Sequence, residues 1–219
     1  MARNDGAPGA ATLERFIAFE SIDGAGTSTQ LAILRGRLEA AGIPHWITAE
    51  PTALPTGRLI REALRGGFPA SPGTIARLFA ADRHEHLHGP GQVLERLERG
   101  EWVLSDRYLF SSLAYQGTAC GDDTPWELNR GFPLPALVLY FEIDPEISLE
   151  RIRSRPDRDI YETLAFQRAL AAAYEAAFAR WSAGSFRLER IDASQSPAEV
   201  AEAVAEALAR GGLSIPRSA

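Results

Sequence analysis

Apolar residues gather in short runs that are separated by longer amphipathic stretches. The clearest runs, and the best candidates for strands, are Phe16–Glu20, Trp102–Ser105 and Ala136–Glu142. The last run is continuously apolar, which is typical of a strand buried on both faces of a parallel sheet. Shorter runs over His45–Thr48 and Phe186–Ile191 predict two further strands.

Between these runs, apolar positions recur with the spacing of one helical face. The predicted helices are Thr29–Ala40, Thr56–Leu64, Pro72–His88, Gly91–Arg99, Glu146–Arg153, Leu164–Ala183 and Pro197–Arg210. Alternating strands and helices favour an α/β fold, in which helices cover both faces of a parallel five-stranded sheet. Such sheets bind ligands at the carboxyl ends of their strands, where Glu20, Glu50 and Asp106 are expected.

The chain shows no internal repeat and no linker between domains. We therefore expect a single domain over 13–212, a disordered leader over 1–12 and a short tail over 213–219. The leader has no apolar core of the kind found in a signal peptide. No apolar run approaches the ~20 residues of a membrane span, so no membrane partner is expected.

Composition narrows the class of partner. The 219 residues carry a net charge of −6, so a broad basic surface for nucleic acid is not expected. One cysteine, Cys120, excludes an intrachain disulfide and fits a reducing, cytoplasmic compartment. All 23 basic residues are arginines, so any cationic side chain that contacts a phosphate must be a guanidinium, which binds as a planar fork.

The segment 20–30 reads E-S-I-D-G-A-G-T-S-T-Q and lies between a predicted strand and a predicted helix. It nearly matches the P-loop pattern G-x-x-x-x-G-K-[ST], but Ser21 stands at the first glycine and Thr27 at the lysine. Backbone N–H groups of such a loop and of the following helix form a cradle for anions. The alternative is a glycine-rich turn with a Ser or Thr helix cap. The candidate ATP- and phosphate-binding residues are Ser21, Gly24, Ala25, Gly26, Thr27, Ser28 and Thr29.

Asp106 and Arg107 end a predicted strand and lead into Ser111–Gly117. An acidic residue at a strand end beside a P-loop holds Mg²⁺ directly or through water, and a neighbouring arginine clamps a phosphate. Ser28 and Asp106 are the candidate metal-binding residues. The alternative for Asp106 and Arg107 is an ion pair at the surface.

Phe79 and Arg83 are four residues apart and share one helical face. A ring beside a guanidinium suits a flat heterocycle, because one stacks and the other donates hydrogen bonds. The alternative is a core phenylalanine beside a solvated arginine.

Two further clusters have a chemical and a plain interpretation. His84-Glu85-His86-Leu87-His88 formally matches the zinc motif H-E-x-x-H, but a third ligand would have to come from elsewhere, and an exposed polar helix end is favoured. Arginines at 151, 153, 155 and 158 form either a solvated helix end or a lid, at about 151–160, that closes over phosphates.

Taken together, these residues resemble the thymidylate kinase family of P-loop nucleoside monophosphate kinases. The resemblance covers about 15–208 and rests on an ordered set of motifs: F-E-S-I-D-G-A-G, A-E-P, G-R-L-I-R, L-F-A-A-D-R, D-R-Y with S-S-L-A-Y-Q-G, and I-D-A-S. It implies a three-layer P-loop NTPase fold, phosphorylation of dTMP by ATP with Mg²⁺ in dTTP biosynthesis, and a homodimer.

The resemblance also implies roles for matching residues. Asp23 would approach the sugar 3′-hydroxyl and magnesium, while Arg61 and Arg107 would hold the dTMP phosphate beside Glu50. Phe79 would stack on thymine and Arg83 would reach its carbonyl oxygen. Three other residues would face the base or the sugar: Ser112, Gln116 and Tyr115, the last where a ribose 2′-hydroxyl would lie. Because Gly24 stands where some members have an arginine, lid residues Arg153 and Arg158 would supply the catalytic cation, and Ala193–Ser196 would lie near adenine.

Departures from the family pattern leave the activity open at this point. Ser21 and Thr27 replace the P-loop glycine and lysine, and Ala49 replaces an arginine often found before Glu-Pro. Loss of one positioned charge from a phosphoryl-transfer site costs roughly 10²–10⁴ in rate. The alternatives to a dTMP kinase are a weak or inactive nucleotide-binding homologue and a kinase for another nucleotide or nucleoside.

Overall fold

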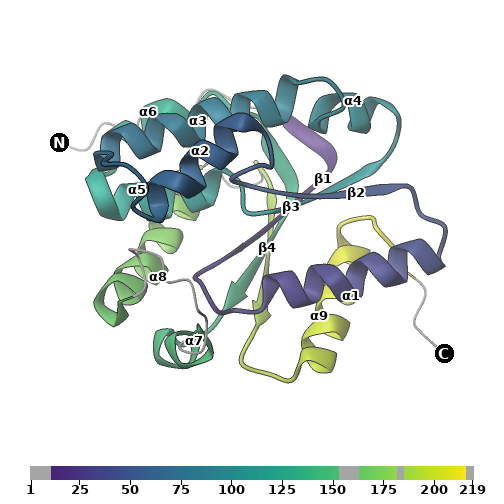
Figure 1. The fold of residues 1–219 in the computed structure, drawn as a ribbon. Helices are drawn as coiled ribbons and strands as arrows, with labels where there is room; N and C mark the ends of the chain where they lie inside the picture. The colour runs from purple at the N-terminus through teal and green to yellow at the C-terminus, as the bar shows by residue number, and fades with distance from the viewer. Residues whose placement is uncertain (1–10, 153–162, 182–184, 216–219) are drawn as a thin grey trace.

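The computed structural model describes residues 11–152, 163–181 and 185–215. In these residues, five strands form one parallel sheet in the order β2-β3-β1-β4-β5. The strands are β1 (Thr12–Ser21), β2 (His45–Ala49), β3 (Trp102–Asp106), β4 (Leu134–Glu142) and β5 (Arg187–Asp192). The predicted α/β fold with a parallel five-stranded sheet is confirmed (Figure 1). The lid candidates Arg153 and Arg158 lie outside the described residues.

Helices connect the strands. They are α1 (Thr27–Ala40), α2 (Pro55–Leu64), α3 (Pro72–His88), α4 (Val93–Glu98), α5 (Leu109–Cys120), α6 (Asp123–Asn129), α7 (Pro145–Ile152), α8 (Leu164–Ala179) and α9 (Pro197–Arg210). The predicted helices coincide with these within a few residues. Two helices, α5 and α6, were not predicted.

Successive side chains of a strand point to opposite faces of the sheet, so both faces are apolar and each packs against a layer of helices. In β1, Phe16 and Ala18 belong to one apolar cluster, which packs against α3, α4, α5 and α8. Ile17 and Phe19 belong to a second cluster, which packs against α1 and α9. Figure 1 shows α1 and α9 side by side on one side of the sheet, and α2 to α6 on the other. The sheet is thus buried on both faces, as its continuous apolar runs indicate.

The first strand is longer than expected. β1 begins at Thr12, inside the range expected to be a leader, and the hydroxyl of Thr12 donates to the Ser185 carbonyl at 2.8 Å. The pairing of β1 with β4 shifts register between Leu13 and Ile17, and Arg15 there has a φ of 62°. The added residues join the sheet through this irregularity, which is why they do not show a clean strand pattern.

The carboxyl ends of the adjacent strands β2, β3 and β1 lie side by side at one edge of the sheet. Phe19 and Ala49 are each in register with Asp106, and the backbone N–H of Glu50 donates to the Asp106 carbonyl at 3.0 Å. The expectation that Glu20, Glu50 and Asp106 lie together is therefore confirmed. Among the residues in the described ranges, no helix has the length and apolar character needed to cross a membrane.

Candidate active site

The loop between β1 and α1 has the form of an anion cradle. Its last residue, Gly26, caps α1 with a φ of 87° and makes no side-chain capping bond. The helical hydrogen bonds begin with Gln30 N–H to the Gly26 carbonyl, at 3.1 Å. The N–H groups of 27–29 therefore lie at the open, electropositive end of the helix. This arrangement differs from the alternative of a helix capped by a Ser or Thr side chain.

Gly24 is fixed by the close approach of α7. Its φ is 84°, and a Cβ atom at this position would lie 2.5 Å from the Ser148 carbonyl oxygen. The Ser148 hydroxyl also donates to the carbonyl of Asp23. The loop is thus packed against α7, and a side chain at 24 has no room.

Asp106 faces the start of α1. Its Oδ2 atom accepts from the Ser28 hydroxyl at 3.4 Å. Burial raises the pKa of Asp106, while the Arg107 charge and hydrogen bonds from Thr27 and Ser28 lower it in part. A carboxylate and a hydroxyl at the phosphate end of the loop are oxygen ligands of the kind Mg²⁺ uses together with substrate phosphates and waters. The donor set therefore fits the predicted magnesium site.

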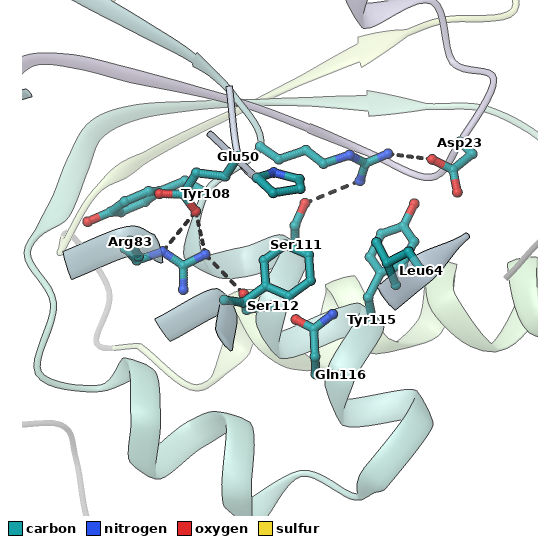
Figure 2. A pocket seen from close by; sticks show the side chains of 12 residues that line it. Asp23, Glu50, Leu64, Arg83, Tyr108, Ser111, Ser112, Tyr115 and Gln116 are labelled. Atoms are coloured by element: carbon teal, nitrogen blue, oxygen red, sulfur yellow. Dashed lines mark hydrogen bonds and ion pairs between the residues drawn. The ribbon is translucent and has the colours of Figure 1, made fainter. Parts of the chain in front are cut away.

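Beside the β1–α1 loop lies a cavity of about 130 Å³, which is lined by residues of this loop, of α2, α3 and α5, and of the turns before α2 and α5 (Figure 2). Seven of the eight residues predicted for the dTMP site line it, together with Asp23. The lining residues are Asp23, Glu50, Pro51, Leu64, Phe79, Arg83, Arg107, Tyr108, Ser111, Ser112, Tyr115 and Gln116. Asp23 was predicted as a catalytic residue, and Arg107 was predicted both as a catalytic residue and as a dTMP-binding residue. The structure thus brings the sequence-predicted acceptor residues into one place, with the exception of Arg61.

Arg107 and Asp23 form an ion pair at the end of the cavity next to the loop. The distance from Nη2 to Oδ1 is 2.6 Å, and both side chains are partly exposed. The other end of the guanidinium donates to the Ser21 carbonyl at 2.9 Å. Burial opposes the positive charge, but Tyr115 and Asp23 raise the pKa of Arg107 well above its usual value. Arg107 is therefore a fixed cation at the junction of loop and cavity.

Arg83 and Glu50 form a buried ion pair at the opposite end. Arg83 Nε and Nη2 donate to Glu50 Oε2 at 3.0 and 2.5 Å, and both side chains are almost fully buried. Nη2 also donates to Ser112 Oγ at 2.9 Å, and Nη1 donates to Asn129. A guanidinium carries five donors, so one N–H of Nη1 is left within the described contacts. The alternative of a solvated arginine is wrong, and Glu50 is engaged with Arg83 here.

His86 belongs to this buried pair and is not a metal ligand. Its Nδ1 atom lies 2.9 Å from Glu50 Oε1, and its Nε2 atom lies 2.8 Å from Thr48 Oγ1. His84 and His88 are exposed on α3, with ring centroids 4.6 Å apart. Within the described ranges, no group of three metal-ligating side chains occurs. The formal zinc motif forms an amphipathic helix end: His84 and His88 are exposed, as expected of a polar helix end, whereas His86 is buried, contrary to that expectation.

The middle of the cavity is suited to a flat polar ring. Phe79 is half-buried on α3 and lines one wall. Gln116 is buried on α5, and its Oε1 atom makes no hydrogen bond in the described part of the chain. Tyr115 lies under the Arg107 guanidinium, whose carbon is 4.8 Å from the ring centroid. A buried amide oxygen without a partner is costly, so its position at a cavity wall points to a ligand donor.

Arg61 lies outside this cavity. It lines a neighbouring, more open hollow of about 590 Å³ that also contains Ser28 and Asp106 and shares Pro51 with the cavity. Its guanidinium donates to the backbone carbonyls of Pro51 and Thr52. Arg151, at the end of α7, donates to the carbonyl of Ala193 at 2.8 Å, and so α7 contacts the segment expected near adenine.

Sequence reasoning missed several residues that shape the site. Tyr108 and Leu64 line the cavity, and Asn129 and His86 hold the Arg83–Glu50 pair. Tyr174 contacts the Ser21 carbonyl from α8 at 2.9 Å. Tyr108 lies in the D-R-Y motif and His86 in the formal zinc motif, but neither motif indicates these contacts, and Leu64, Asn129 and Tyr174 lie in none of the motifs discussed above.

Comparisons with known proteins agree with this geometry. The family model described as thymidylate kinase matches residues 19–204. A protein of Treponema pallidum named "Putative thymidylate kinase" is 44% identical over 167 residues, covering 76% of this chain and 80% of the relative. A thymidylate kinase of Thermomicrobium roseum is 41% identical over 197 residues, covering 86% of this chain and 91% of the relative. The chain belongs to the thymidylate kinase family.

Proposed function

We propose that the protein transfers the γ-phosphoryl group of ATP to dTMP, giving dTDP for dTTP synthesis. One observation carries the proposal: the base-facing Gln116 and the phosphate-facing Arg107 line a single cavity that opens beside an anion-binding loop. Family membership and the names of the relatives support the same activity.

In this proposal the base occupies the middle of the cavity. Phe79 stacks on thymine, and the unpaired amide oxygen of Gln116 accepts from its ring N–H. The remaining Nη1 donor of Arg83, which is already held by Glu50, Ser112 and Asn129, faces a base carbonyl. Glu50 thus acts through Arg83, by holding its guanidinium in place.

The phosphate end lies at the loop. Arg107 binds the acceptor phosphate, and Asp23 holds the guanidinium and approaches the sugar 3′-hydroxyl. Arg61 exchanges its carbonyl partners for the same phosphate, because a charge-assisted bond to phosphate is stronger than a bond to a neutral carbonyl. The acceptor oxygen is already anionic, so positioning and charge neutralisation carry the reaction and no strong base is required.

Ser28 and Asp106 would hold Mg²⁺, directly or through water. When bound, the ion would supply positive charge to the phosphate oxygens of ATP. The loop N–H groups of 24–29 cradle the phosphates, and Ser21 shapes the start of the loop through its carbonyl contacts.

We further infer that Thr27 stands where the P-loop pattern has lysine. The packing of Gly24 against α7 leaves no space for an arginine at position 24. The proposed source of the missing cation is therefore Arg153 or Arg158, in the segment outside the described residues. A homodimer and a cytoplasmic location remain predictions from the family resemblance.

The deciding assay measures ADP release with purified protein, ATP, Mg²⁺ and one acceptor at a time. We expect turnover with dTMP, and weaker turnover with dUMP, dCMP and the ribose form of TMP. Arg153→Ala or Arg158→Ala should abolish turnover, whereas Arg99→Ala, at an exposed arginine that follows α4, should not. Tight binding of dTMP without turnover at any Mg²⁺ or ATP concentration would refute the kinase and favour a non-catalytic homologue.

A further inference from the structure

Glu20 is a buried carboxylate that the proposed reaction does not use. It lies near the end of β1 with no exposed surface. Its Oε1 atom accepts from the backbone N–H of Tyr108 at 2.9 Å. Its Oε2 atom accepts from the hydroxyls of Ser111 at 2.5 Å and Tyr174 at 3.2 Å. The carboxylate therefore joins β1 to the β3–α5 turn, to α5 and to α8.

The contacts of Glu20 also help to hold the backbone of the turn that contains Arg107. Arg107 has a φ of 71°, a left-handed conformation that is unfavourable for a residue other than glycine. Its own N–H donates to the Phe19 carbonyl at 2.8 Å, and the next N–H, that of Tyr108, donates to Glu20. Two consecutive backbone groups are thus tied to the end of β1, which is what holds the strained turn.

The guanidinium of Arg107 is held by the same network. Nη1 donates to Ser111 Oγ at 3.2 Å, and Ser111 in turn donates to Glu20. Tyr174 lies 2.8 Å from Ser111 and donates to the Ser21 carbonyl, which also accepts from Arg107. Figure 2 shows Ser111 beneath the guanidinium that reaches Asp23.

We propose that Glu20 is a positioning residue that fixes the Arg107 turn and aims its guanidinium at the acceptor phosphate. The proposal rests on the proposed function, because it assumes that Arg107 meets this phosphate. Glu20 has no access to the cavity, so it acts through the Tyr108 N–H and the Ser111 hydroxyl rather than on substrate.

Because Glu20 changes its charge near neutral pH, the pH dependence of activity can test its positioning role. Burial raises the pKa of Glu20 to about 7, although Ser111 and Arg107 oppose the shift. Other titratable groups face it from α8 and β4: Tyr174 and, in register on the next strand, Tyr140. Burial also raises the pKa of both phenols, so they stay neutral while Arg107 stays charged. Glu20 is thus the group of this cluster whose charge changes near neutrality.

The experiment compares the wild type with Glu20→Gln, which keeps the size of the side chain and removes its charge. We expect kcat/KM for dTMP to fall at least tenfold at pH 8, while KM for ATP changes less than twofold. The wild-type profile of kcat/KM should fall below about pH 7 more steeply than the variant profile. The dTMP phosphate, with a second pKa of about 6, contributes equally to both profiles. The difference between the wild-type and Glu20→Gln pH profiles therefore reports the protonation of Glu20.

Glu39→Gln, an exposed glutamate of α1, is the matched control and should leave all parameters unchanged. Ser111→Ala and Tyr174→Phe keep the carboxylate and remove one link each. They should lower kcat/KM for dTMP by a smaller factor, and they replace Glu20→Gln if that variant does not fold. Equal losses for dTMP and ATP, or an unchanged pH profile in Glu20→Gln, would overturn the proposal.

The experiment distinguishes failure of the positioning role of Glu20 from failure of the proposed kinase activity. If the wild type phosphorylates dTMP and Glu20→Gln is equally active, the positioning role is wrong and the kinase stands. If the wild type does not turn over, calorimetry of dTMP binding replaces kinetics. In that case a dTMP affinity at least tenfold weaker in Glu20→Gln supports the positioning role, and an equal affinity overturns it.

Discussion

Replacing Glu50 by alanine should destabilise the fold as strongly as a large core truncation. The Glu50 carboxylate accepts from Arg83 at two positions and from His86, and it is 3% exposed. Arg83 is 1% exposed, so its charge has no access to water once Glu50 is removed. Removal of one partner of a buried ion pair costs about 3–5 kcal/mol, because the other charge is left buried without compensation.

The contacts that Arg83 keeps determine where in this range the loss of stability in Glu50→Ala is expected to fall. Arg83 keeps its bonds to Ser112 and Asn129 and its position over the Tyr108 ring, at 5.1 Å from the centroid. These contacts are to neutral groups, so they offset only part of the lost attraction. We expect about 4 kcal/mol for Glu50→Ala, a large share of the roughly 5–15 kcal/mol that stabilises a domain. Glu50→Gln, which keeps an acceptor oxygen, should cost less.

Urea unfolding at pH 7.5, followed by circular dichroism, measures these differences at constant m-value. The double variant Glu50→Ala/Arg83→Met removes both charges and fills the space of the arginine. Its free energy of unfolding should exceed the value expected from adding the two single losses by at least about 2 kcal/mol. Additive losses, or a loss below about 1 kcal/mol for Glu50→Ala, would refute the buried-pair argument.

The pH dependence provides a second test of the same pair. Burial alone would raise the pKa of Glu50, but Arg83 and His86 lower it below its ordinary value of 4.5. A carboxyl whose pKa is lowered in the folded state stabilises the fold above its unfolded pKa. This contribution should be complete above about pH 5 and should be lost as pH falls through the folded-state pKa. The stability gap between wild type and Glu50→Gln should therefore narrow in acid.

Three further changes test other parts of the structure. Since the pKa of Glu20 is raised to about 7, the folded state binds its proton more tightly than the unfolded state. The wild type should thus lose about 3 kcal/mol of stability between about pH 4.5 and 7 relative to Glu20→Gln, and parallel unfolding curves would contradict this. Gly24→Ala should cost at least about 2 kcal/mol, measured by thermal unfolding, because a Cβ there meets the Ser148 carbonyl at positive φ. Tyr115→Ala should reduce the preference of kcat/KM for dTMP over its ribose form, and unchanged selectivity would remove Tyr115 from the sugar site.

The parts of the fold that the sequence predicts are those with a local signal. All of the predicted strands form, because each is a short apolar run bounded by turns. Helix α5 was missed for a physical reason: Leu109–Gly117 is buried on every side, so its polar residues do not fall on one face. Helix α6 is short and contains Pro125, so it has little periodicity of its own.

The functional site can likewise be divided into features that the sequence predicts and features that it does not show. Glu50 and Arg107 follow strand ends, which the topology of a parallel sheet brings to one edge. The meeting of these residues with Asp23 and Phe79 was implied by the family resemblance. What the sequence could not show is how their charges are used. Arg83 reads as an exposed helix residue, and only the contacts from Glu50, Ser112 and Asn129 make it a buried, oriented donor.

The proposed replacement of the P-loop lysine has a structural consequence that follows from the contacts of the loop. The Thr27 and Ser28 side chains both hydrogen-bond to Asp106, so Thr27 contributes to the candidate metal side and carries no positive charge for the γ-phosphate. Arg107 is committed to Asp23 and the Ser21 carbonyl, and Gly24 cannot carry a side chain. Arg61, which lines the hollow that contains Ser28 and Asp106, donates only to neutral backbone carbonyls, so it can turn to a phosphate at low cost. We therefore expect the transferring group to be neutralised from outside the loop, so Thr27→Lys should raise ATP affinity while Arg153→Ala or Arg158→Ala removes turnover. Loss of turnover in the arginine variants that Thr27→Lys then restores would place the two cations in the same role.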